Sequence, residues 1–89
     1  MIEKRITIIN KLGLHARAAS RFVTLASGFA SEIQLAKNGQ VINGKSIMGV
    51  MMLAASKGTV LEMTVSGEDE DEAASRLERL VLDRCGEDE

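Results

Sequence analysis

Four stretches of the chain alternate between apolar and polar residues, as half-buried β-strands do. They cover residues 2–9, 32–37, 40–43 and 59–66. In the first stretch, Ile2, Ile6 and Ile8 fall on one side of an extended chain. Asn38-Gly39 stands between the second and third stretches, and this pair is a strong signal for a two-residue turn. The pattern therefore predicts four strands, two of them joined in a hairpin.

Three other stretches follow the helical period. After Ala16, one helix face is apolar, with Ala19, Phe22, Val23 and Ala26, and Gly28 supplies a stop. Ser46 can cap a short helix over residues 47–53, and the acids of residues 68–72 suit the first turn of a last helix. From Gly86 onward we expect a frayed end. A sheet that alternates buries only one face, so we predict an α+β, two-layer fold with three helices on one face of a four-stranded antiparallel sheet.

Length and composition narrow the function classes. With 89 residues, 45% of them apolar, the chain has enough material for one domain and one core, residues 1–89. It contains no apolar run of about 18 residues and no signal-peptide pattern, so we expect a cytoplasmic protein without membrane insertion. Cys85 is the single cysteine, which argues against a disulfide or structural zinc and indicates a spare thiol on the last helix. We predict no metal and no cofactor.

Charge is unevenly distributed along the chain. Residues 1–67 carry eight Lys/Arg against three Asp/Glu, whereas residues 68–89 carry three against ten. The balance is thus +5 against −7, and the only histidine, His15, lies in the basic part. This favours anionic ligands or acidic partner surfaces. The chain has no Trp, no Tyr and two Phe, so nucleic-acid binding through base stacking is not expected.

His15 stands where the first strand pattern gives way to the first helix. A helix N-terminus presents free N–H groups and a positive dipole end, which attract anions. Arg17 adds a guanidinium suited to phosphate, and Gly13 permits close approach. The sequence offers neither an orienting acid for a hydrolytic triad nor companion ligands for a metal. We therefore predict that the imidazole itself accepts and releases a group, supported by Arg17 and the N–H groups of Ala16 and Arg17.

Residues 39–46 and the second predicted helix also suggest possible functions. Residues 39–46 match the nucleotide-binding pattern GxxxxGK[ST] letter by letter, but Gly39 belongs to the hairpin turn and residues 40–43 to a strand, so we predict no ATP site there. The second helix is apolar nearly all round. We expect Val50 and Leu53 to face the core, and we expect a partner-docking patch at Ile47, Met48, Met51 and Met52, since flexible thioethers adapt to several partners.

The whole chain resembles the HPr family, the histidine-containing phosphocarriers of the bacterial phosphoenolpyruvate-dependent phosphotransferase system. The resemblance rests on Gly13-Leu14-His15-Ala16-Arg17, on Gly44-Lys45-Ser46-Ile47-Met48-Gly49, and on the length and order of elements. It implies an open-faced β-sandwich with the sheet order 1-4-2-3, which the pattern alone does not separate from a ferredoxin-like order.

The same resemblance implies roles for individual residues. His15 Nδ1 would receive a phosphoryl group from enzyme I and pass it to a IIA protein or domain, while Arg17 stabilises the phosphohistidine. Ser46 matches a position that a dedicated kinase/phosphorylase modifies in many members. A carrier of this kind is a protein substrate and not a stand-alone enzyme, and we expect a monomer.

One departure from the usual family motif is Ala18, where most members have proline. Thr24, Ser27 and Gly49 also replace basic residues of some sugar-transport members, and with the acidic end they make the chain similar to the nitrogen-related branch, NPr. The rival interpretation of the whole chain is a small regulatory binding module, in which His15 and Arg17 capture an anionic metabolite or a partner carboxylate without phosphoryl transfer.

Overall fold

The predicted strands form one antiparallel sheet in the computed structural model, which describes residues 1–89. The strands are β1 (Ile2–Thr7), β2 (Glu32–Lys37), β3 (Gln40–Asn43) and β4 (Val60–Ser66). Their order in the sheet is β1-β4-β2-β3. This confirms both the α+β class and the order 1-4-2-3 that the resemblance implied.

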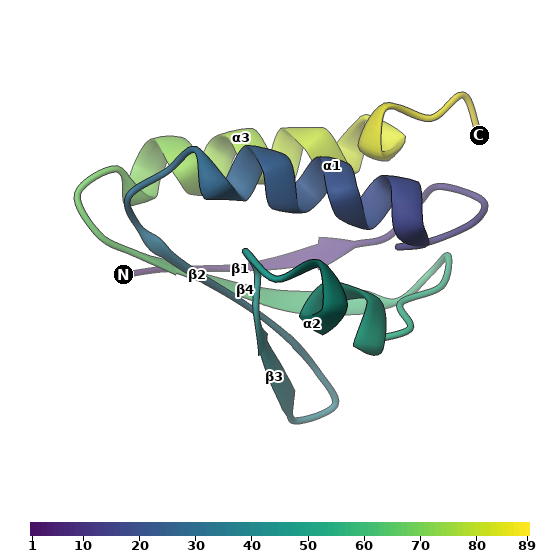
Figure 1. Ribbon diagram of the computed structural model, residues 1–89, viewed down its shortest axis with the longest axis horizontal. Helices are drawn as coiled ribbons and strands as arrows, with labels where there is room; N and C mark the ends of the chain where they lie inside the picture. Colours follow the sequence, from purple (N-terminus) through teal and green to yellow (C-terminus); the bar gives the residue numbers. More distant parts are fainter.

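Three helices complete the second layer: α1 (Ala16–Ser27), α2 (Ile47–Met52) and α3 (Glu70–Leu82). Helices α1 and α3 run side by side above the sheet, and α2 lies below α1 in the view of Figure 1. The apolar faces of the helices and of the sheet enclose a core cluster of 22 buried residues. Val50 and Leu53 belong to it, as predicted.

The hairpin between β2 and β3 has the predicted turn. Asn38 and Gly39 have φ values of 49° and 86°, and Lys37 pairs with Gln40 across the ladder. Residues 40–43 are therefore a strand and Gly39 a turn residue, so residues 39–46 do not form the single glycine-rich loop that a nucleotide site needs.

The ends of several elements differ from the prediction. Strand β1 ends at Thr7, although Ile8 is fully buried and its N–H still bonds to the Thr59 carbonyl at 2.9 Å. Helix α3 ends at Leu82, and a short turn, η1 (Arg84–Gly86), follows it. Cys85 is thus not a spare thiol on the last helix but is buried in this turn, and burial raises the pKa of its thiol to about 11.

Candidate functional site

The loop before α1 is held tightly against the segment that leads to β4. The Leu14 N–H donates to the Ala55 carbonyl at 2.8 Å. Gly13 has a φ of 66°, and a Cβ there would collide with the Ala55 carbonyl oxygen and the Ser56 Cα. Only glycine fits this position without strain, and the close contact fixes the place from which His15 enters the helix.

His15 is the N-cap residue of α1, which is one of the two positions, cap or first turn, that the sequence pattern allowed. Its backbone is extended, with φ −74° and ψ −179°, and its side chain makes no capping hydrogen bond. The first N–H groups of a helix have no partner inside it. The imidazole therefore lies beside a helix end whose N–H groups are open to an anion.

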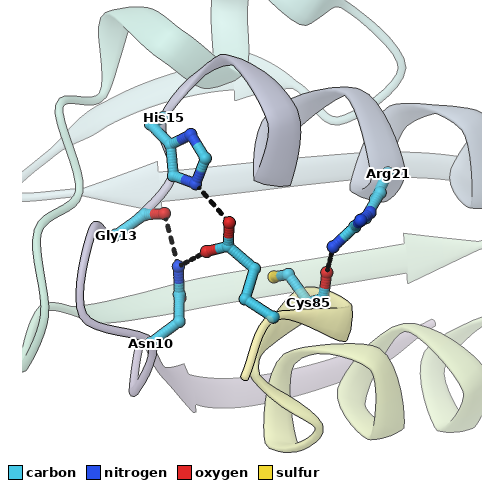
Figure 2. Close-up of polar contacts among 6 residues, drawn as sticks. Asn10, Gly13, His15, Arg21 and Cys85 are labelled. Carbon is cyan, nitrogen blue, oxygen red and sulfur yellow. Dashed lines mark hydrogen bonds and ion pairs between the residues drawn. The ribbon is translucent and has the colours of Figure 1, made fainter. Parts of the chain in front are cut away.

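The ring of His15 is held by an acid that comes from the far end of the chain. Its Nε2 lies 2.7 Å from Oε2 of Glu87, and its side chain is 29% exposed. The amide nitrogen Nδ2 of Asn10 donates to Oε1 of Glu87 at 2.7 Å and to the Gly13 carbonyl at 2.7 Å. Figure 2 shows the carboxylate between the imidazole and the buried Asn10, with the second ring nitrogen directed away from it.

The turn after α3 brings Glu87 to this place. Arg84, Cys85 and Gly86 all have positive φ, at 56°, 53° and 78°, and they turn the chain back toward the start of α1 (Figure 1). Nη1 of Arg21 donates to the Cys85 carbonyl at 2.7 Å, and the Lys11 N–H donates to the Glu89 carbonyl at 2.6 Å. The prediction of a frayed end from Gly86 onward is wrong, because these bonds tie the tail to α1 and its preceding loop.

The environment of Glu87 favours its charged form. Partial burial alone would raise the pKa of its carboxyl group. The hydrogen bonds from Asn10 and His15, together with the nearby positive charges of His15 and Arg21, outweigh that effect and lower the pKa below its ordinary value of 4.5. Glu87 is therefore a carboxylate throughout the neutral range.

Ala16 and Arg17 follow His15 in the chain, and neither forms a hydrogen bond or an ion pair with its ring. Both are exposed, and none of the five ion pairs involves Arg17. Arg17 lines a shallow hollow together with Lys11, Arg21 and the acidic tail, residues 86–89. His15 lies in the basic part of the chain, as the sequence shows, but the acidic tail folds onto this part. The surroundings of His15 are therefore mixed in charge.

The second predicted region surrounds α2. The Ser46 hydroxyl accepts a hydrogen bond from the Gly49 N–H at 3.1 Å, which confirms it as the helix cap. The predicted docking residues are all exposed, at 44% for Ile47, 73% for Met48, 43% for Met51 and 65% for Met52. Their exposure agrees with the prediction, while their role in docking stays a prediction.

Glu87 and Asn10 are the site residues that sequence reasoning missed. Glu87 is 72 positions from His15, in a tail whose composition resembles a solvated end, and Asn10 looked like an ordinary loop residue. No local signal in the sequence connects the two. The statement that the chain offers no orienting acid is therefore wrong for His15, although no triad is formed.

The structure contains no group of three or more His, Cys, Asp or Glu side chains that could hold a metal ion. None of its helices combines the length and the apolar character that a membrane crossing requires.

Comparisons with known proteins agree with one another. The family model described as "PTS HPr component phosphorylation site" matches residues 2–83. The phosphocarrier protein HPr of Neisseria meningitidis serogroup A is 54% identical over 89 residues, all of both chains, and that of Pseudomonas aeruginosa is 52% identical over 85 residues, 94% of each. The crystal structure of HPr-C-His from Thermoanaerobacter tengcongensis is similar with a TM-score of 0.96, at 45% identity over 100% of both chains. The chain therefore belongs to the HPr family, the phosphocarrier proteins of the phosphotransferase system, which carry a phosphoryl group and do not act as stand-alone enzymes.

Proposed function

We propose that His15 is the residue that carries the phosphoryl group. It accepts the group from the phosphorylated histidine of enzyme I and passes it to a IIA protein or domain. The observation that carries this proposal is the state of the imidazole: Nε2 is engaged by Glu87, whereas Nδ1 has no partner and stands at the N-terminus of α1.

The transfer is a nucleophilic substitution at phosphorus. The lone pair of His15 Nδ1 forms the new P–N bond, while the P–N bond of the donor breaks and its electron pair returns to the donor imidazole. The same step in the opposite sense delivers the group to the acceptor. This transfer between two imidazoles requires no metal or cofactor.

The N–H groups of Ala16 and Arg17 and the guanidinium of Arg17 would hold the phosphoryl oxygens. A helix dipole contributes about 0.3–1 kcal/mol at an exposed end, and each hydrogen bond to a charged group about 1.5–3 kcal/mol. This support is modest, and it suits a carrier that must release its group as readily as it accepts it.

We further propose that the exposed apolar residues of α2 dock the partners. Ile47, Met48, Met51 and Met52 form a patch, here called the α2 patch, on a helix that packs against α1. Ser46 lies at the start of the same helix. A kinase/phosphorylase acting on Ser46 would add about −1.5 to −2 charges beside the patch and so hinder docking of acidic partners.

The unit that performs this function would be residues 1–89 as a single domain and a monomer, working in the cytoplasm where phosphoenolpyruvate can feed the relay. The nitrogen-related branch stays a prediction, since the relatives reported above carry the name HPr.

Incubation with phosphoenolpyruvate and catalytic enzyme I, followed by intact mass measurement, tests the carrier function. We expect a gain of one phosphoryl group that is labile in acid and stable in base, and that is lost in His15→Ala. Ser46→Ala, which removes the other proposed phosphorylation site, should retain the gain. No gain in the parent chain, with enzyme I active on another carrier, would favour the rival binding module.

A further inference from the structure

A continuous chain of hydrogen bonds leads from a backbone carbonyl to the imidazole of His15 (Figure 2). It begins at the Gly13 carbonyl, which accepts from Asn10 Nδ2, and continues through the second N–H of the same amide to Oε1 of Glu87. Oε2 of Glu87 then meets His15 Nε2. Each of these three contacts measures 2.7 Å.

The Gly13 carbonyl determines which group donates in each of these hydrogen bonds. A carbonyl oxygen can only accept, so the amide of Asn10 must turn its NH₂ group toward Gly13. The same NH₂ group donates to Glu87, and a carboxylate has no proton to give. Nε2 of His15 must therefore be the donor in the last bond, and the ring proton of the neutral imidazole stays on Nε2.

We propose that Glu87, oriented by the buried Asn10, is a positioning residue that keeps the His15 proton on Nε2 and so leaves Nδ1 with the free lone pair that attacks phosphorus. The effect on phosphoryl transfer rests on the carrier function proposed above. The effect on the position of the proton does not.

The contact between Glu87 and His15 also compensates the positive charge that the ring acquires during the transfer. As the Nδ1 lone pair forms the P–N bond, the ring acquires positive charge and the donor's P–N bond breaks with its electrons returning to the donor. The proton stays on His15 Nε2 throughout, next to the negative carboxylate of Glu87. An acid at this distance therefore stabilises the ring in the state in which it is phosphorylated.

The tail is built to hold Glu87 in place. Arg84 and Cys85 adopt left-handed backbone conformations that are unfavourable for residues other than glycine. Arg21 binds the carbonyl of this turn, and Lys11 binds the carbonyl of Glu89 beyond it. The match to the family model ends at residue 83, so Glu87 and the turn that holds it lie beyond the matched residues.

Glu87→Gln provides a sharp test, because it replaces one acceptor oxygen by a donor. The new amide would turn its oxygen toward the NH₂ of Asn10, since two NH₂ groups cannot bond to each other. Its own NH₂ then faces His15 Nε2, which must accept. We expect the ring proton to move to Nδ1, which removes the nucleophile. Glu87→Ala provides neither an acceptor nor a donor for His15 Nε2, so a mixture of the two tautomers should result.

The proton is located by long-range ¹H–¹⁵N correlation of the His15 ring at a pH where the imidazole is neutral, without any phosphoryl donor. The rate of phosphorylation by enzyme I is measured separately. We expect Glu87→Gln to be slower by roughly tenfold, on the scale of one lost hydrogen bond to a charged group. Glu68→Gln is the matched control, since Glu68 carries the same substitution, is exposed in the turn between β4 and α3 and takes part in none of the ion pairs.

The two proposals fail in different ways. If the parent protein carries its proton on Nδ1, or if Glu87→Gln behaves as Glu68→Gln in both measurements, the positioning role of Glu87 is wrong while the carrier function stands. If the parent shows the Nε2–H tautomer but accepts no phosphoryl group on His15, the carrier function is wrong and the hydrogen-bond chain remains as a structural feature.

Discussion

Gly13 shows how a residue without a side chain determines the geometry of the site. Its positive φ and its close approach to Ala55 bring the loop onto the neighbouring segment, and its carbonyl is the starting point of the hydrogen bonds that reach Glu87. The residue therefore acts twice, through its backbone conformation and through its oxygen.

Gly13→Ala should lower the free energy of unfolding by about 2–3 kcal/mol, because it adds a collision to an unfavourable φ. Urea denaturation measures this change. Gly39→Ala is the matched control, since Gly39 has a φ of 86° but nothing within 4 Å of its added Cβ, and it should lose only about 1 kcal/mol. Equal losses in the two variants would contradict the importance of the close contact.

The sequence allowed His15, Gly13 and Arg17 to be predicted as site residues because they are neighbours at a change from strand to helix period. Glu87 could not be predicted in this way. Its contact with His15 depends on how α3 lies across the sheet and on left-handed backbone at Arg84 and Cys85, which nothing in their side chains requires. Tertiary geometry, and not local pattern, brings the acid to the imidazole.

At the scale of elements, α2 has a buried side and an exposed side within six residues. Val50 anchors it in the core, whereas the α2 patch faces outward. Ser46 satisfies the Gly49 N–H of its first turn. A short helix has few bonds of its own, so its cap and its core contact decide whether it stays folded.

Substitutions at Ser46 separate the cap from the charge. Ser46→Ala should lower the free energy of unfolding by about 0.5–2 kcal/mol with little change in phosphoryl transfer. Ser46→Asp keeps a good cap, so stability should change little, but its charge should slow transfer from enzyme I. Stopped or quenched-flow transfer kinetics alongside urea denaturation provide both readouts. Unchanged kinetics in Ser46→Asp would refute the proposed regulation.

Met48→Gln should weaken binding to enzyme I or a IIA protein by roughly fivefold, the effect of losing about 1 kcal/mol at an interface. Glutamine keeps the length and helix propensity of methionine, so the free energy of unfolding should stay within about 0.5 kcal/mol. Titration calorimetry measures the affinity. Leu82→Gln is the control, because Leu82 is 64% exposed on α3, away from the α2 patch, and a similar loss there would argue against docking at α2.

The elements themselves were largely predictable, because alternation and helical spacing reflect which side of each element is buried. Their order in the sheet was not, since every strand alternates in the same way and the pattern contains no information about neighbours. The local pattern also does not determine where each helix begins. Asp69, for example, directly precedes α3, but its carboxylate accepts hydrogen bonds from the N–H groups of Ala30 and Ser31 and does not cap the helix.

At the scale of the whole molecule, three carboxylates with lowered pKa values connect segments that are far apart in sequence. Asp69 accepts from the Ser31 hydroxyl and from the Ala30 and Ser31 N–H groups. Glu70 bonds to the N-terminal ammonium of Met1 at 2.9 Å, and Glu87 bonds to His15. The hydrogen bond from Ser31 is the main cause that lowers the pKa of Asp69, and the bond from the N-terminus is the main cause for Glu70.

These lowered pKa values predict acid sensitivity. The contribution of each carboxylate to stability is complete above its ordinary pKa, 3.8 for Asp69 and 4.5 for Glu70 and Glu87. It is lost as the pH falls through the lower pKa of the folded state, since the unfolded chain then binds more protons. The free energy of unfolding should therefore fall below about pH 4.5.

Urea denaturation at a series of pH values measures how the free energy of unfolding depends on pH, with Asp69→Asn as the variant. Asp69→Asn should be less stable than the parent at neutral pH and should approach it in acid, where the parent has lost the same charge. Asp88→Asn removes an exposed acid that lies outside the helices and strands, so it should follow the parent at all pH values. If the free energies of unfolding of Asp69→Asn and of the parent ran parallel over the whole pH range, the Asp69 carboxylate would not contribute to the acid sensitivity.

We propose that His15 carries the phosphoryl group on Nδ1 while Glu87 holds the proton on Nε2. The most direct measurement is ¹⁵N and ³¹P NMR of the ¹⁵N-labelled protein after phosphorylation by enzyme I and phosphoenolpyruvate. We expect phosphorus coupled to Nδ1 of His15, with Nε2 still bearing its proton. Phosphorus on Nε2, on another residue, or on no residue of the folded protein would contradict it.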